Sequence, residues 1–75
     1  MQIYQNINGD SGVAEYEIGI DSITVQFKDS SVYRYTYGSA GSANIEAMKG
    51  LAASGDGLNA YINRNVRKLY AAKLR

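Results

Sequence analysis

The stretch SITVQFKDSSVYRYTY, residues 22–37, holds two runs in which apolar and polar side chains alternate. Alternation with a period of two is typical of β-strands that bury one of their faces. The runs are separated by an Asp-Ser-Ser cluster at residues 29–31, and these residue types favour turns. A link this short makes the two strands antiparallel. The preceding run, GVAEYEIGI at residues 12–20, alternates in the same way, so we predict a three-stranded antiparallel β-meander.

Three tyrosines, Tyr33, Tyr35 and Tyr37, occupy alternate positions at the end of this stretch. In an extended strand they lie on one face of the sheet. The row has two interpretations, because it either contributes to a small core or forms an exposed platform on which nucleic-acid bases stack. The chain has one phenylalanine and no tryptophan, which favours a core role for Tyr33 and Tyr35. Tyr37 stays open to either role.

After Gly38 the pattern changes from that of a strand to that of a helix. Ile45 and Met48 begin an apolar stripe with helical spacing, which predicts a helix with Ser42 as its N-cap. Gly55 stands where a helix commonly ends.

The last segment shows the clearest helical periodicity, and we predict a second helix that is capped by Ser54 or Asp56. Its predicted apolar stripe runs to the end of the chain and comprises Leu58, Tyr61, Ile62, Val66, Leu69, Tyr70 and Leu74.

Two amphipathic helices after three strands predict an α+β fold (βββαα) in which both helices pack on one face of the meander. Seventy-five residues are enough for one domain, which we place at residues 11–75. Residues 1–10 then form a short N-terminal extension that is either an edge strand or loose.

The composition argues against several classes of function. The chain has no cysteine and no histidine, so it lacks thiolate ligands, the commonest zinc ligand and the commonest general base. We therefore expect neither an enzyme nor a metal or cofactor site. No apolar run is long enough to cross a bilayer and no secretory signal is visible at the start, so we expect a cytoplasmic protein without membrane contact.

The charges are unevenly distributed along the chain. Residues 1–38 hold five acidic and two basic side chains, whereas residues 57–75 hold five basic side chains and no acid. A basic segment of this kind predicts contact with nucleic acid, and the candidate binding residues are Arg64, Arg67, Lys68, Lys73 and Arg75, together with Tyr37. The structural alternative is a solvated helix face whose cations also complement the helix dipole.

From about residue 11 to residue 70 the chain resembles the KTSC domain, a short domain named for the C-terminal extension of certain lysyl-tRNA synthetases and also found alone in bacterial and phage proteins. One signature is Tyr-x-Tyr after an alternating strand, and the other is Ser-x-Gly followed by a helix with further motif residues. The matching residues for which we expect structural roles are Tyr33, Tyr35, Ser54, Tyr61, Asn63 and Tyr70. Arg67 also matches the second signature and stays a candidate binding residue.

The chain departs from the family pattern at two links. The turn at residues 29–31 lacks the usual glycine, and GSAGSAN at residues 38–44 replaces a connection that commonly holds proline. The resemblance implies RNA binding only by association with a synthetase. We therefore predict a small non-enzymatic binding module that takes RNA through its basic C-terminal segment. The alternative is a protein-interaction or self-association module.

Overall fold

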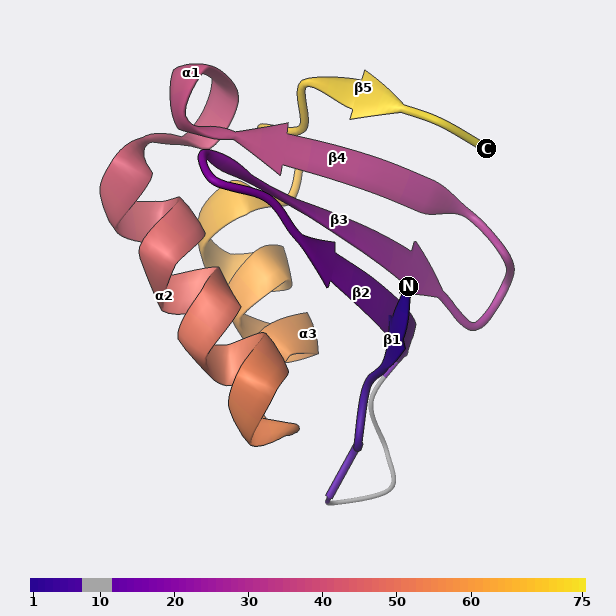
Figure 1. Cartoon of the computed structure of the whole chain (residues 1–75). Coiled ribbons are helices and arrows are strands. Elements are labelled where there is room, and N and C mark those ends of the chain that lie inside the picture. Colours follow the sequence, from indigo (N-terminus) through magenta and orange to yellow (C-terminus); the bar gives the residue numbers. More distant parts are fainter. Residues whose placement is uncertain (8–11) are drawn as a thin grey trace.

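The fold is built on one antiparallel sheet whose strands follow each other in chain order (Figure 1). The structure is a computed structural model and describes residues 1–7 and 12–75. The five strands are β1 (Gln2–Ile3), β2 (Val13–Ile18), β3 (Ser22–Phe27), β4 (Val32–Thr36) and β5 (Ala72–Lys73). The predicted meander is therefore its centre, β2 to β4. The predicted count of three strands is wrong, because a short strand is added at each edge.

The register determines which side chains share a face of the sheet. Tyr16 pairs with Val25 and Val25 with Tyr33, and in the next row Ile23 pairs with Tyr35. Paired residues point to the same side of an antiparallel sheet, so these five side chains form one apolar face.

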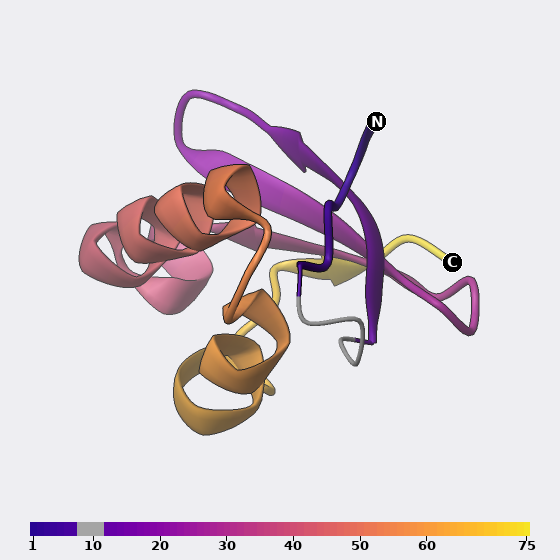
Figure 2. The ribbon, with the colours of Figure 1, turned by 90° about the horizontal axis from the view of Figure 1, so that it is seen from below.

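Four helical segments follow the central strands: α1 (Tyr37–Ala40), α2 (Ser42–Ser54), α3 (Leu58–Tyr61) and the π-helical turn η1 (Ile62–Val66). All of them lie on one side of the sheet (Figure 2). The residues predicted to form a small-residue link thus form α1 and the start of α2. Thr36 and Ser39 cap α1 reciprocally, whereas Ser42 is the first residue of α2 and not its N-cap.

The core fills the space between the apolar sheet face and the helices. Gly55 ends α2 in the left-handed conformation, with φ of 80°, which confirms the prediction that a glycine terminates this helix. The buried residues that form the core are Tyr4, Val13, Tyr16, Ile23, Val25, Tyr35, Ala40, Ile45, Met48, Ala52, Leu58, Ile62 and Val66.

The predicted long C-terminal helix is wrong beyond Val66. Its first half exists as α3 and η1, and it begins after Gly57 rather than after a side-chain cap at Ser54 or Asp56. The chain then turns away and pairs with the open edge of β4. Backbone hydrogen bonds join Ala71 N to Arg34 O and Leu74 N to Val32 O, both at 2.7 Å. Strand pairing at an otherwise open edge thus outweighs the helical periodicity of the last nine residues.

Residues 2–4, near the N-terminus, pack against the sheet and the helix layer. Tyr4 is 3% exposed, and its hydroxyl accepts a hydrogen bond from the backbone N–H of Leu58 at 3.2 Å. Gln2 and Ile3 pair with β2, so of the two alternatives for the extension the structure has the edge strand. The predicted boundary between residues 10 and 11 lies outside the described residues. Within the described part of the chain, none of the helices is both long and apolar enough to span a bilayer.

Candidate nucleic-acid interface

An aromatic cluster lies where β4 and β5 meet, on the helix side of the sheet. The ring of Tyr70 contacts the ring of Tyr33 with centroids 4.8 Å apart and that of Tyr35 at 6.5 Å, both edge-on. Phe27 contacts Tyr33 from the other side at 5.8 Å. Tyr70 is 40% exposed, so one ring of the cluster presents itself to solvent. Edge-on contacts of this kind contribute about 0.5–1.5 kcal/mol each beyond burial.

The tyrosine row is divided between core and surface. Tyr35 is 1% exposed, and burial together with the nearby Tyr33 and Tyr70 raises its pKa to about 12. Tyr33 is partly buried and packs against the core. Tyr37 has left the strand and begins α1. The row is therefore not an exposed platform of three rings, because the exposed ring of Tyr37 lies off the strand and the buried Tyr35 separates it from Tyr33.

Lys73 places a cation on this aromatic cluster. It pairs across the strands with Tyr33, and its Nζ lies 5.7 Å from the centroid of the Tyr33 ring. At this distance an ammonium group is attracted to the ring face. The pKa of Asp29 is lowered chiefly by hydrogen bonds from Ser31, and the Lys73 cation is the smallest cause.

Three more cations precede Tyr70 in the chain. Arg64 lies on η1, and Arg67 and Lys68 lie in the turn that follows it. All three are exposed, and none of them makes an ion pair within the described residues. Tyr70, Tyr33 and the four cations Arg64, Arg67, Lys68 and Lys73 are called the aromatic–basic rim below.

The other two predicted binding residues lie away from this rim. Arg75 lines a hollow of about 350 Å³ on the opposite face of the sheet, beside Glu15 and Val32. Tyr37 donates a hydrogen bond to Glu46 Oε2 at 2.5 Å, and this bond is the main cause of its raised pKa. Lys49 Nζ lies 5.7 Å from the Tyr37 ring centroid and also pairs with Glu46 at 2.9 Å. Glu46 thus already binds both members of this second cation–aromatic pair, Tyr37 and Lys49.

Most of the remaining motif residues make local hydrogen bonds that account for a structural role. Ser54 donates a hydrogen bond from its Oγ to Leu51 O at 2.9 Å and so closes the end of α2. Tyr61 donates to Asn44 Oδ1 at 2.6 Å and ties α3 to α2. Asn63 is exposed, and the asparagine that bonds the backbone is its neighbour Asn65, whose Nδ2 donates to Tyr61 O at 3.2 Å.

Sequence reasoning missed the partnership of Phe27, Tyr70 and Lys73 with the tyrosine strand. The apolar spacing of the last segment predicts a helix at Tyr70 and Lys73, and nothing local shows that residues 69–73 return to the sheet. The period of two gives no signal here, because Ala72 pairs with Arg34 on the open face whereas Tyr70 contacts Tyr33 on the helix side. Within residues 1–7 and 12–75, no group of three His, Cys, Asp or Glu side chains is placed to hold a metal ion.

No protein-family model, no curated protein and no solved structure matches this chain. The resemblance to the KTSC domain therefore stays a prediction. The fold and the geometry of the rim are the observations on which a function can be argued.

Proposed function

We propose that this chain is a small non-enzymatic module that binds unpaired RNA through the aromatic–basic rim. The observation that carries the proposal is Tyr70, an exposed ring that rests on Tyr33 beside the Lys73 cation. A base that stacks on an exposed aromatic ring contributes about 1–3 kcal/mol, and adjacent cations neutralise phosphate. Unpaired RNA is favoured over a duplex because only splayed bases reach a ring.

The rim differs from the predicted site in how its cations are arranged. They do not line one helix but lie along a helical turn, a loop and a strand. Four cations and one exposed ring support weak binding that is indifferent to sequence. The net charge of +1 adds little long-range attraction. We expect the logarithm of the affinity to fall with the logarithm of salt concentration with a slope of about −3, since each phosphate contact contributes roughly −0.7 for single strands.

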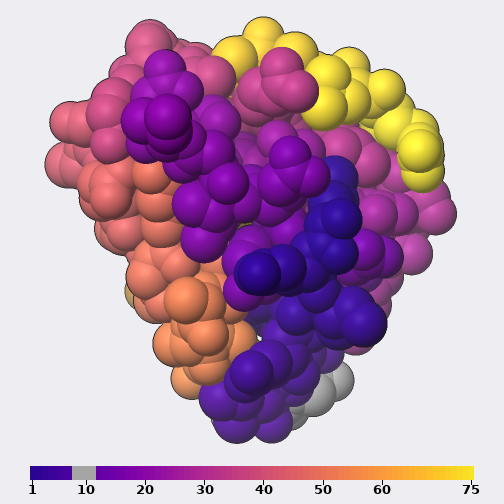
Figure 3. Space-filling view, viewed as in Figure 1, coloured from indigo at the N-terminus to yellow at the C-terminus, as the bar shows by residue number. Residues whose placement is uncertain are grey.

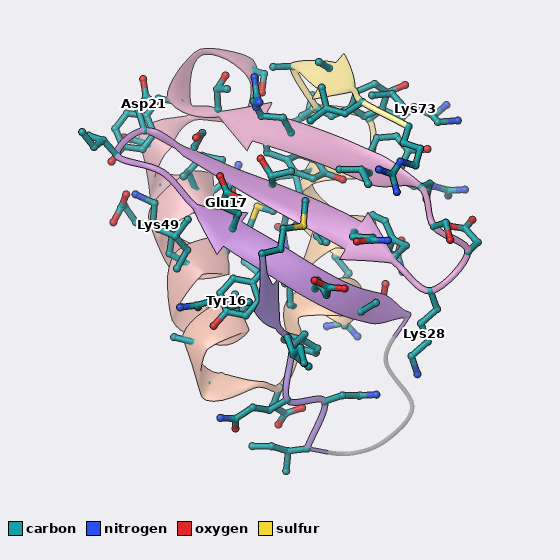
Figure 4. All side chains as sticks on the ribbon, turned by 45° about the vertical axis from the view of Figure 1, so that its right-hand side comes forward. Tyr16, Glu17, Asp21, Lys28, Lys49 and Lys73 are labelled. Atoms are coloured by element: carbon teal, nitrogen blue, oxygen red, sulfur yellow. The ribbon has the colours of Figure 1, made fainter. Side chains whose placement is uncertain are left out.

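An amide NMR titration with a short oligouridine, at low and at physiological salt, tests the proposal. We expect salt-sensitive shifts confined to residues 64–73 and the neighbouring part of β4. The two cation–aromatic pairs supply a matched control. Lys73→Ala should reduce the salt slope by roughly 0.7. Lys49→Ala, which removes the cation paired with Glu46 at the other end of the strands, should leave the slope unchanged (Figure 4).

Tyr70→Leu separates stacking from charge, because leucine keeps apolar cover over Tyr33 without an aromatic face. We expect affinity to fall about tenfold, the loss of roughly one weak stacking contact. The absence of shifts at low salt would overturn the proposal. Equal losses for Lys73→Ala and Lys49→Ala would show that RNA contacts the chain without using the rim.

A further inference from the structure

The face of the sheet that no helix covers carries an ordered pattern of side chains. Two rows cross it, and the register fixes both. The first row runs from Glu17 through Thr24 to Arg34. The second row contains Ile3, Glu15, Gln26 and Val32, and Leu74 lies beyond it on the β5 side.

Within residues 1–7 and 12–75, the charged side chains of this open face form no ion pairs. The ion pair of the described residues joins Lys49 to Glu46, on α2 and not on the open face. Glu17 and Arg34 are exposed and stand two strands apart, roughly 10 Å between backbones. No ion pair joins them within the described residues. Figure 4 shows Glu17 on the meander with no helix in front of it. The face therefore holds acid on β2 and base on β4 that do not meet.

The apolar members lie at both margins. Ile3 at the β1 margin is 77% exposed, and Leu74 at the β5 margin is 48% exposed. Met1, which is 51% exposed, lines the hollows on the face between them. In the space-filling view the yellow C-terminal segment follows one edge of the face, and the indigo N-terminal segment lies over part of the purple and magenta strands (Figure 3). Along the first row, from β2 to β4, the order is acidic, neutral, basic, whereas the second row has Glu15 on β2 and the apolar Val32 on β4. The charge order of the first row is its own complement when it is reversed, and apolar side chains lie at both margins.

We propose that the open face binds the open face of a second copy of this chain, with a two-fold axis parallel to β3. Rotation about that axis lays β2 of one copy over β4 of the other. Glu17 and Arg34 lie in one register row, so each Glu17 meets Arg34 of the second copy at the same height. The same rotation lays the β1 margin, with Ile3, over the β5 margin of the second copy, with Leu74.

A two-fold axis perpendicular to the strands does not work as well. It lays β2 over β2 and β4 over β4, and like charges then face each other across the contact. The face also contains the hollow of about 350 Å³ between Met1 and Leu74, into which side chains of the second copy can pack. Charge, apolar margins and register thus select one arrangement, and none of these observations depends on RNA binding.

The area of the open face limits the expected affinity of one copy for another. The two larger dimensions of the chain are 31 and 24 Å, so one face offers close to or less than the roughly 800 Å² per partner of a standard specific interface. The surface is also mixed in polarity. We therefore expect a dissociation constant on the order of 100 µM.

Sedimentation equilibrium over about 10 µM to about 1 mM measures this association, and the apparent mass should rise toward that of a dimer. Amide shifts on dilution should fall on Thr24, Gln26 and Arg34 of the open face. A constant monomer mass over the whole range overturns the proposal. Shifts confined to the helix side would overturn it as well, because the chain would then associate through another surface.

Charge reversal gives a sharper test. Glu17→Arg alone and Arg34→Glu alone each place like charges in both symmetric pairs, so each variant should dimerise about tenfold more weakly. An equimolar mixture of the two variants restores both opposite-charge pairs. The mixture should therefore associate about as strongly as the unaltered chain. Association of each variant by itself at unaltered strength overturns the proposed arrangement.

Arg67→Glu is the matched control for charge, since it changes the net charge as Arg34→Glu does but lies on the rim. It should leave dimerisation unchanged and weaken RNA binding. Thermal unfolding of each variant verifies that it is folded. If oligouridine shifts Arg34 instead of residues 64–73, the open face binds RNA and the proposal of a second copy fails.

Discussion

The two faces of the central strand β3 (Ser22–Phe27) differ in what they contribute. Ile23 and Val25, on the helix side, are fully buried, and Tyr35 of the next strand packs beside them. On the opposite side Thr24 lies between the exposed charges of Glu17 and Arg34. The helix-covered face therefore supplies most of the buried apolar surface that stabilises the fold. The open face buries Thr24 and Val32 but otherwise carries exposed charges and exposed apolar margins.

The largest expected effect comes from making the same substitution on both sides of the sheet. Ile23→Ala removes a side chain that is 0% exposed and should lower the free energy of unfolding by about 2–5 kcal/mol. Ile3→Ala removes one that is 77% exposed and should change it by less than about 0.5 kcal/mol. Urea unfolding at low protein concentration measures both.

The total stability of a chain this short is only about 4–11 kcal/mol, so Ile23→Ala risks failing to fold. Ile23→Val then serves instead, with an expected loss of about 0.5–1.5 kcal/mol. Equal effects of the matched substitutions at residues 3 and 23 would mean that the helices do not cover the face to which we assign them.

The pH dependence of the free energy of unfolding tests whether Tyr35 is buried on the helix-covered face. Its pKa is raised from 10.0 to about 12, mainly because burial disfavours the phenolate. The unfolded chain therefore loses this proton first as pH rises. The contribution to stability is complete below pH 10 and is lost between pH 10 and pH 12, by roughly 2–3 kcal/mol in all.

Tyr35→Phe is the matched variant, since it keeps the ring and removes the ionisable group. Its stability should fall less steeply over the same pH interval, as measured by urea unfolding at a series of pH values. Identical slopes for the two chains would contradict a buried Tyr35 hydroxyl.

The central strands could be predicted from the sequence because their signal is local. Alternation over residues 13–18, 22–27 and 32–36 specifies both strand and face, and the short links specify an antiparallel order. Gly55 was predictable for a similar reason, because a left-handed helix end requires a residue without Cβ. Each of these inferences used only neighbours in the chain.

The C-terminal third could not be predicted in this way. Residues 58–66 form the expected helical turns, but residues 71–74 pair with β4, some forty residues earlier. That pairing depends on the open edge of β4 and on the place that Tyr70 finds against Tyr33. Four of the five cations predicted to bind nucleic acid belong to the aromatic–basic rim, but their arrangement along a turn, a loop and a strand was not predicted. The other two predicted residues, Tyr37 and Arg75, lie on other surfaces.

Two glycines of the helix layer should have smaller effects than Ile23→Ala, and these effects have opposite signs. At Gly55 an added Cβ would lie 2.6 Å from Gln5 Cβ, and its φ of 80° strains any L side chain. Gly55→Ala should therefore lower the free energy of unfolding by about 1–2 kcal/mol. Gly50, inside α2 (Ser42–Ser54), is exposed and would meet nothing within 4 Å.

Gly50→Ala should raise the free energy of unfolding by about 0.5–1 kcal/mol, because alanine restricts the unfolded chain and favours helix. Thermal unfolding of the two variants beside the unaltered chain shows the difference directly. A loss of stability at residue 50 would place the outer surface of α2 against another part of the molecule. A gain at residue 55 would separate the end of α2 from Gln5, and with it the N-terminal segment from the helix layer.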